Sequence, residues 1–191
     1  GFFKGIYHAN LESNRLSELS FEMFHQAFDM KYLYLNKNKI EKIEYKTFSN
    51  MKLLKNLDLS ENLIIHFHHS TFRKLNNLIN LNLSYNSLKF IEKDLFSDIY
   101  SVEILDLSSN KISSIGDFSF ENLIYLKKLY LDSNPNLVEI KSKFTFHGIR
   151  NIMRIFLTSN ILKVNFTNVL NLKDSLKHRE FERNLNRKYF Y

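Results

Sequence analysis

An asparagine recurs every 24 residues through most of this chain, always at the same place in a repeated apolar frame. The frame reads L-x-x-L-x-L-x-x-N-x-L-x-x-L, and one copy runs from Leu54 through Asn62 to Phe67. The series consists of Asn14, Asn38, Asn62, Asn86, Asn110, Asn134, Asn160 and Asn184. The interval lengthens to 26 residues only between Asn134 and Asn160. A period of this length predicts a repeat architecture, in which each unit packs on its neighbours.

Each L-x-L core alternates with period two and therefore predicts a short strand whose leucines face inward. One 24-residue unit cannot bury its own leucines, so we expect the strands of successive repeats to stack. The asparagine follows the strand, where a buried amide would satisfy backbone groups left unpaired by the turn. A phenylalanine stands ten residues after each of the first five asparagines, and we expect it to fill the space under the returning chain. These are Phe24, Phe48, Phe72, Phe96 and Phe120.

The complete frame, including an apolar residue three positions after each phenylalanine, resembles the typical leucine-rich-repeat class. That class is the 24-residue form found in Toll-like receptor ectodomains and secreted leucine-rich immune proteins. The resemblance covers nearly the whole chain. It implies an α/β-type repeat solenoid, a horseshoe with a short parallel strand per repeat on its concave face and mostly irregular or short helical convex returns. It also implies a recognition module of an extracellular receptor, or of a secreted immune or adhesion protein. An intracellular scaffold for protein–protein interaction is the alternative.

We expect a single solenoid over residues 1–191, with about seven regular repeats over 5–175. Residues 176–191 predict a degenerate polar capping repeat, because Arg179 occupies an otherwise apolar column. A basic helix over residues 172–191 is the alternative. The chain opens inside a repeat, so we expect a fragment of a longer protein. Two residues are inserted between Asn134 and Phe146, and we expect a protruding loop there.

The chain carries a net charge of +7, which would suit an acidic partner. Lys, Asn, Ile, Phe and Tyr are all abundant while alanine occurs only twice, as in a protein from an AT-biased genome. Part of the lysine excess then reflects codon usage rather than selection for an acidic partner. We therefore expect a protein ligand or co-receptor rather than nucleic acid. Disulfides and thiolate metal sites are excluded because the chain has no cysteine. No apolar run is long enough to cross a membrane, so we expect no membrane insertion by this segment.

Catalytic motifs are missing from the sequence: it has no Gly-rich phosphate loop, no H-E-x-x-H and no G-x-S-x-G. We expect no enzymatic activity and no cofactor. His66, His68 and His69 surround Phe67, which the repeat requires inward. Because they lack a carboxylate or thiol partner at a fixed spacing, we interpret them as solvated turn residues and predict no metal site.

Aromatic and basic side chains occupy several outward positions of the predicted strands. The candidate binding residues on the concave face are Tyr32, Tyr34, Lys127, Lys128, Tyr130, Arg154 and Phe156. Exposed Tyr, Phe and Arg on a rigid sheet are enriched at binding hot spots, although Tyr and Phe also suit strands for their own sake. Asp58 and Asp106 stand between these groups, about 10 Å apart at a spacing of about 4.8 Å per strand. That separation is too large for a shared proton or ion, so we interpret them as a polar floor.

Two N-glycosylation sequons begin at Asn82 and Asn165. The composition alone would produce about three by chance, so they do not indicate a compartment. A glycan on Asn82 would stand in the middle of the concave sheet and direct a ligand to the flank of the solenoid.

Overall fold

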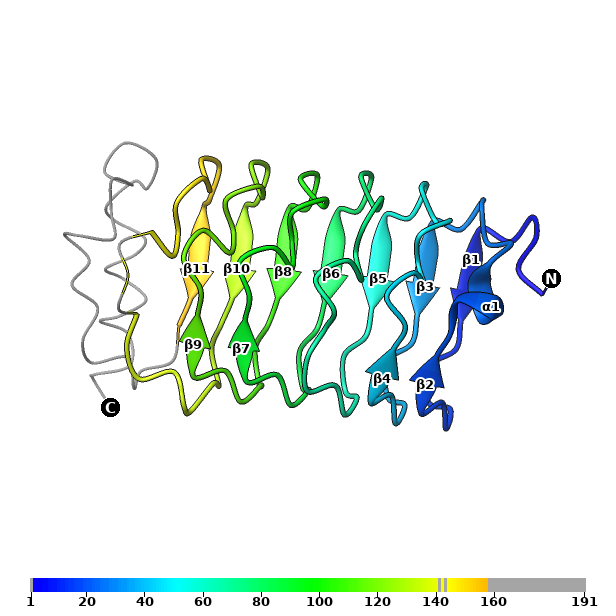
Figure 1. Ribbon diagram of the computed structural model, residues 1–191, viewed down its shortest axis with the longest axis horizontal. Helices are drawn as coiled ribbons and strands as arrows, with labels where there is room; N and C mark the ends of the chain where they lie inside the picture. The colour runs from blue at the N-terminus through cyan, green and yellow to red at the C-terminus, as the bar shows by residue number, and fades with distance from the viewer. Residues whose placement is uncertain (1, 141, 143, 158–191) are drawn as a thin grey trace.

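The computed structural model describes residues 2–140, 142 and 144–157 of the chain. Seven short strands form one parallel sheet in chain order, side by side along the long axis of the molecule (Figure 1). They are β1 (His8–Asn10), β3 (Tyr32–Tyr34), β5 (Asn56–Asp58), β6 (Asn80–Asn82), β8 (Ile104–Asp106), β10 (Lys128–Tyr130) and β11 (Arg154–Phe156). This arrangement confirms the predicted repeat solenoid with one short parallel strand per repeat. We call each unit from one of these strands to the next a coil.

The strands form where the L-x-L frame predicts them, and their middle residue faces the core. From β1 to β10 that residue is Ala9 or a leucine, and each is buried. From β1 to β10 the register advances by 24 residues between neighbouring strands, as in Leu33 opposite Leu57, and from β10 to β11 it advances by 26. Because the first and third residues of a strand point to the other face, the sheet presents two outward columns of side chains.

A second, smaller set of strands lies on the returning part of the coils. The strand β2 (Glu18–Leu19) pairs with β4 (Lys42–Ile43), and β7 (Phe90–Ile91) pairs with β9 (Ser114–Ile115), both in parallel. Figure 1 shows both pairs below the seven-stranded sheet. The only helix in the described part of the chain is α1 (Phe21–Phe24). The returns are therefore irregular in part, as expected, but the strand pairs were not predicted from the sequence.

A hydroxyl column accompanies these return strands, one residue before the column phenylalanine. The Thr47 hydroxyl donates to the Leu19 carbonyl oxygen at 3.2 Å, and the Ser119 hydroxyl donates to that of Ile91 at 3.3 Å. Each bond joins a coil to the strand of the coil before it. Thr71, whose coil has no return strand, has a buried hydroxyl with no partner among the described residues. Among Thr47, Thr71 and Ser119, the hydroxyl therefore bonds to the preceding coil in the two coils whose return strands pair, and not in the coil that lacks one.

The predicted phenylalanine column lies in the core, and its rings contact one another between most neighbouring coils. All five predicted rings are buried, and Phe146 continues the stack in the coil with the insertion. The ring centroids of Phe96 and Phe120 lie 6.0 Å apart with planes at 11°, and those of Phe120 and Phe146 lie 6.0 Å apart at 9°. At the other end Phe3 contacts Phe24 at 5.0 Å. The column therefore fills the space between the sheet and the returns, as expected.

The two inserted residues are taken up at two separate places rather than in a single loop. Leu137 is buried although it follows Asn134 by three positions instead of two, so one extra residue precedes it. Ile140 is also buried and precedes Phe146 by six positions, whereas Ile115 precedes Phe120 by five. The second extra residue therefore lies between Ile140 and Phe146. Both ends of the interval keep their places, since β10 and β11 pair in parallel across the 26-residue interval.

A left-handed residue precedes every asparagine of the column from Asn14 to Asn134. These residues are Ser13, Lys37, Glu61, Tyr85, Ser109 and Ser133, with φ between 52° and 57°. A non-glycine residue seldom adopts this conformation, and the sequence did not predict it. The turn that carries the chain out of the sheet therefore has one backbone form in all six coils.

Candidate functional site

The candidate site is the outward side of the seven-stranded sheet, which we call the sheet face and which is the face expected to be concave. Its two columns are set by the strand register, so each side chain has a neighbour from the next coil. The first column holds His8, Tyr32, Asn56, Asn80, Ile104, Lys128 and Arg154, and the second holds Asn10, Tyr34, Asp58, Asn82, Asp106, Tyr130 and Phe156. Aromatic residues gather at both ends of the sheet, and its centre holds acids and amides together with Ile104.

The N-terminal end of the sheet face carries an aromatic cluster of His8, Tyr32 and Tyr34. The His8 ring centroid lies 5.8 Å from that of Tyr32 and 5.3 Å from that of Tyr34. Tyr32 is exposed and Tyr34 is half-buried. The two tyrosines were predicted from the sequence and His8 was not, although it stands 24 residues before Tyr32 and so shares its column.

The C-terminal end carries a second cluster, formed by Lys128, Tyr130, Arg154 and Phe156. The Tyr130 and Phe156 rings stack with centroids 4.3 Å apart and planes at 2°. Lys128 lies opposite Arg154 in the neighbouring column. The rings are half-buried rather than fully exposed, because each covers one face of the other.

Lys127 differs from the expectation that it occupies an outward strand position. It lies just before β10, and its ammonium group forms an ion pair with the Glu103 carboxylate at 2.8 Å. The strand begins one residue later because the backbone N–H groups of both Lys127 and Lys128 donate to the Glu103 carbonyl oxygen. Lys127 is exposed, but part of its charge is already balanced.

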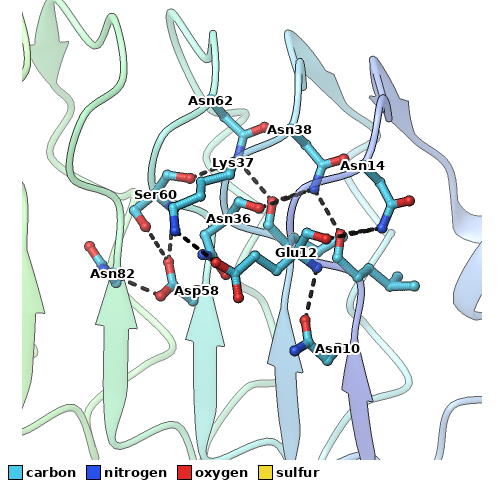
Figure 2. A network of polar contacts seen from close by, with 12 residues as sticks. Asn10, Glu12, Asn14, Asn36, Lys37, Asn38, Asp58, Ser60, Asn62 and Asn82 are labelled. Carbon is cyan, nitrogen blue, oxygen red and sulfur yellow. Dashed lines mark hydrogen bonds and ion pairs between the residues drawn. The ribbon is translucent and has the colours of Figure 1, made fainter.

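The centre of the sheet face is organised by short hydrogen bonds within each coil. One carboxylate oxygen of Asp58 accepts from the Ser60 backbone N–H at 2.9 Å and from the Ser60 hydroxyl at 2.6 Å (Figure 2). Asp106 and Ser108 repeat this geometry. The remaining Asp58 oxygen accepts from the Asn82 side chain at 3.4 Å. These carboxylates stabilise the turn that follows the strand. The serine that recurs two residues after each aspartate is the feature of the sequence from which this contact could have been predicted.

Asn82, the sequon residue in the described part of the chain, uses its amide in the same way. Its side-chain oxygen accepts from the Ser84 N–H and hydroxyl at 3.1 and 2.8 Å. The nitrogen that would carry a glycan is the one directed to Asp58. Asn165, the other sequon residue, lies outside the described residues.

A ladder of asparagine side chains lines the edge of the sheet where the chain leaves the strands (Figure 2). The Asn62 amide nitrogen donates to the carbonyl oxygens of Leu35, Leu59 and Ser60, each at 3.0 Å. Its side-chain oxygen accepts from the Ile40 N–H at 2.9 Å. Two of the four bonds therefore reach the preceding coil. The same four bonds recur at Asn38, Asn86, Asn110 and Asn134, all of which are buried.

Asn14 is an exception to the expected burial of this column. It is exposed, and its amide nitrogen donates only within its own coil, to the carbonyl oxygens of Leu11 and Glu12. The side chain is the same as in the other coils, but no described coil precedes this one to form the two bonds between coils. Asn160 and Asn184 lie outside the described residues.

An ion pair between Glu12 and Lys37 joins the first two coils beside this ladder. Their side-chain oxygen and nitrogen lie 2.9 Å apart (Figure 2). The hydrogen bond from Lys37, followed by its charge, lowers the pKa of Glu12, and the same contact raises the pKa of Lys37. Because the folded pKa of Glu12 is depressed, its small stabilising effect is present above the ordinary pKa of a glutamate and is lost as pH falls through the folded pKa.

Replacing Lys37 by Gln is expected to return the pKa of Glu12 toward its ordinary value, because both contributions from the ammonium group disappear. The carboxyl titration of Glu12, followed by NMR, measures this change. Lys39→Gln removes a nearby exposed charge and serves as the control. An equal rise of the Glu12 pKa in both variants would show that general charge, rather than the direct contact, causes the shift.

The three histidines lie exposed around buried Phe67, as the repeat frame requires. The rings of His68 and His69 are 4.1 Å apart, and His68 also contacts Tyr45 at 5.5 Å. Within residues 2–140, 142 and 144–157, no group of three or more His, Cys, Asp or Glu side chains is arranged to hold a metal ion. No helix in this part of the chain is long and apolar enough to span a membrane.

Comparison with known families finds the same repeat in consecutive stretches of the chain. A family model described as a leucine rich repeat matches residues 6–64, 52–112 and 100–162. A search of curated proteins finds no match.

Many solved structures share the fold, and two examples follow. The chain is similar to TLR13 in a crystal structure of a TLR13–ssRNA13 complex, with a TM-score of 0.75 and 28% identity over 79% of this chain and 21% of that one. It is also similar in fold to a chain of the Toll–Spatzle complex of Drosophila, described as a hub in development and innate immunity. There the TM-score is 0.75 and the identity 23%, over 82% of this chain and 22% of that one. The chain thus spans about a fifth of the length of both structures.

Proposed function

Because the chain belongs to the leucine-rich repeat family, we propose that it is a non-catalytic recognition module that binds a protein ligand or co-receptor through its sheet face. The observation that carries this proposal is the C-terminal cluster. Tyr130 and Phe156 are held parallel by the register of β10 and β11, with Lys128 and Arg154 beside them. Aromatic and arginine side chains dominate the binding energy of many interfaces. Rings already ordered by the fold lose little further entropy on binding.

The remainder of the sheet face is consistent with one extended contact surface. The His8, Tyr32 and Tyr34 cluster offers a second aromatic anchor at the other end of the sheet. Between the clusters, Asp58, Asn82 and Asp106 are engaged with the serines of their own coils. A polar centre flanked by two anchors would favour a partner that reaches along several coils.

The triple substitution Tyr130→Ala, Arg154→Ala and Phe156→Ala is expected to weaken partner binding by about a hundredfold or more, since single hot-spot truncations cost about 2 kcal/mol or more. The partner is identified in a panel of purified secreted proteins and receptor ectodomains, and its affinity is measured by surface plasmon resonance. The melting temperature should fall only slightly, because the lost ring stack is worth about 0.5–1.5 kcal/mol.

The matched control replaces Phe90, Tyr100 and Arg150 by Ala. All three are exposed and lie outside the strands of the sheet face. This variant is expected to keep its affinity. If the sheet-face variant binds as tightly as the wild type, or if both variants lose affinity equally, the sheet face is not the binding surface.

We further propose that the protein is extracellular or at the cell surface, as part of a receptor or of a secreted immune or adhesion protein. The support is the resemblance to the typical repeat class and the likeness to TLR13 and Toll. An intracellular scaffold is the alternative, and a signal peptide in the full-length gene separates the two. We keep the prediction of a single solenoid of about seven repeats. It ends either in a capping repeat over residues 176–191 or in a basic helix over residues 172–191.

Single-stranded RNA is a second candidate partner. The TLR13 complex contains ssRNA, so this likeness does not support the expectation of a protein partner rather than nucleic acid. Positive side chains beside aromatic rings are the combination that binds single strands in general, and Lys128 and Arg154 stand beside Tyr130 and Phe156. An RNA oligonucleotide therefore belongs in the binding panel. RNA binding that depends on these four residues would replace the protein partner.

A further inference from the structure

A groove of about 470 Å³ lies on the returns of the first three coils, away from the strands of the sheet face. Phe21 lines it from the first coil, Tyr45 and Lys46 from the second, and His68, Arg73 and Lys74 from the third. Phe21 follows the return strand β2, and Tyr45 and Lys46 follow β4. The third coil has no return strand, and its lining residues lie in the corresponding segment. The groove therefore runs across successive coils, along the axis of the solenoid.

The charge of the groove is positive. Lys46, Arg73 and Lys74 are exposed, and none of the described residues that line the groove is acidic. Glu44 lies at the margin, where its carboxylate accepts from the Phe21 backbone N–H at 2.9 Å. Ser49 and Ser70 add hydroxyl groups to the lining. Cations with nearby hydroxyl donors are complementary to sulfate or phosphate groups.

The aromatic ring of Tyr45 supports these polar groups instead of offering a free stacking surface. The Lys46 ammonium lies 5.0 Å from its ring centroid, and the His68 ring centroid lies 5.5 Å away. His68 in turn contacts His69 at 4.1 Å. A nucleobase needs an open aromatic face, and this ring already has two neighbours. The arrangement therefore favours a polyanion without bases over a single-stranded nucleic acid.

We propose that this groove binds a sulfated polysaccharide, whose sulfate groups contact Lys46, Arg73 and Lys74. Cations contributed by two adjacent coils suit a linear polymer that carries negative charges at short intervals. The site is separate from the sheet face, so a protein partner and the polysaccharide would be bound at the same time by different surfaces.

The test measures heparin binding by the full chain in isothermal titration calorimetry at physiological salt. The variant Arg73→Gln with Lys74→Asn removes two charges and keeps polar side chains. Asn is chosen because residue 74 has a φ of 71°, which asparagine tolerates better than most residues. The affinity is expected to fall by about tenfold or more, because charge-assisted contacts are lost. Lys46→Gln, on the neighbouring coil, is expected to weaken binding in the same direction.

The control removes the same number of charges elsewhere. Lys89→Gln with Lys111→Gln changes exposed lysines of later coils. This variant should retain the heparin affinity, and desulfated heparin should not bind the wild type. Equal losses in both double variants would overturn the proposal, because net charge alone would then explain binding. Tighter binding of poly-uridine than of heparin at Arg73 and Lys74 would overturn the choice of ligand. A heparin site that fails these tests leaves the Tyr130 and Phe156 experiment unaffected.

Discussion

Replacing Phe96 by Ala is expected to lower the free energy of unfolding by about 4 kcal/mol, within the range of about 3–5 kcal/mol for buried Phe→Ala changes. The Phe96 side chain is 1% exposed and stands between two other rings of the stack. Its centroid lies 6.2 Å from that of Phe72 and 6.0 Å from that of Phe120. The truncation therefore removes contacts with both neighbouring coils. In a repeat protein the interfaces between neighbours supply much of the stability.

Urea denaturation followed by circular dichroism measures this loss. The control is Phe90→Ala, six residues earlier in the same coil, because that ring is 45% exposed and leaves a smaller gap. We expect Phe90→Ala to cost about 1 kcal/mol or less, since much of its transfer free energy is not realised in the folded state. Equal destabilisation by the two substitutions would contradict the role of the stack as the core of the solenoid.

Replacing Asn86 by Ala is expected to lower the free energy of unfolding by about 3 kcal/mol, because each unsatisfied buried polar group costs about 1–3 kcal/mol. The Asn86 amide donates to the carbonyl oxygens of Leu59, Leu83 and Ser84, and it accepts from the Ile64 N–H at 3.0 Å. Alanine provides neither donor nor acceptor. The Ile64 N–H and the Leu59 carbonyl belong to the preceding coil, so the contact between coils is weakened as well.

The same denaturation measurement on Asn14→Ala supplies a control at the equivalent position of the repeat. Asn14 is exposed, and its two bonds stay within its own coil. Water can replace them, so we expect a loss of at most about 1 kcal/mol. If Asn14→Ala is as damaging as Asn86→Ala, the asparagine contributes through the local turn rather than through the ladder between coils.

Part of the candidate site could be read from the repeat frame. Tyr32, Tyr34, Tyr130 and Phe156 lie on the outward columns because strand alternation fixes which side chains leave the core. Three features were missed: the contact of His8 with the tyrosines, the ion pair of Lys127 with Glu103, and the serines that bind Asp58 and Asp106. Each depends on the side-chain conformation of a neighbour, which a pattern of apolar residues does not specify.

The period determined the architecture because a 24-residue unit with one inward L-x-L core can bury its leucines only against its neighbours. The register of the sheet, the inward phenylalanine stack and the places of the asparagines follow from that requirement. Tertiary structure decided the rest. It divided the two inserted residues between the segments before Leu137 and after Ile140, placed strands on some returns only, and left Asn14 exposed. These outcomes depend on contacts between coils, where backbone groups must find partners in a neighbour whose position no single repeat encodes.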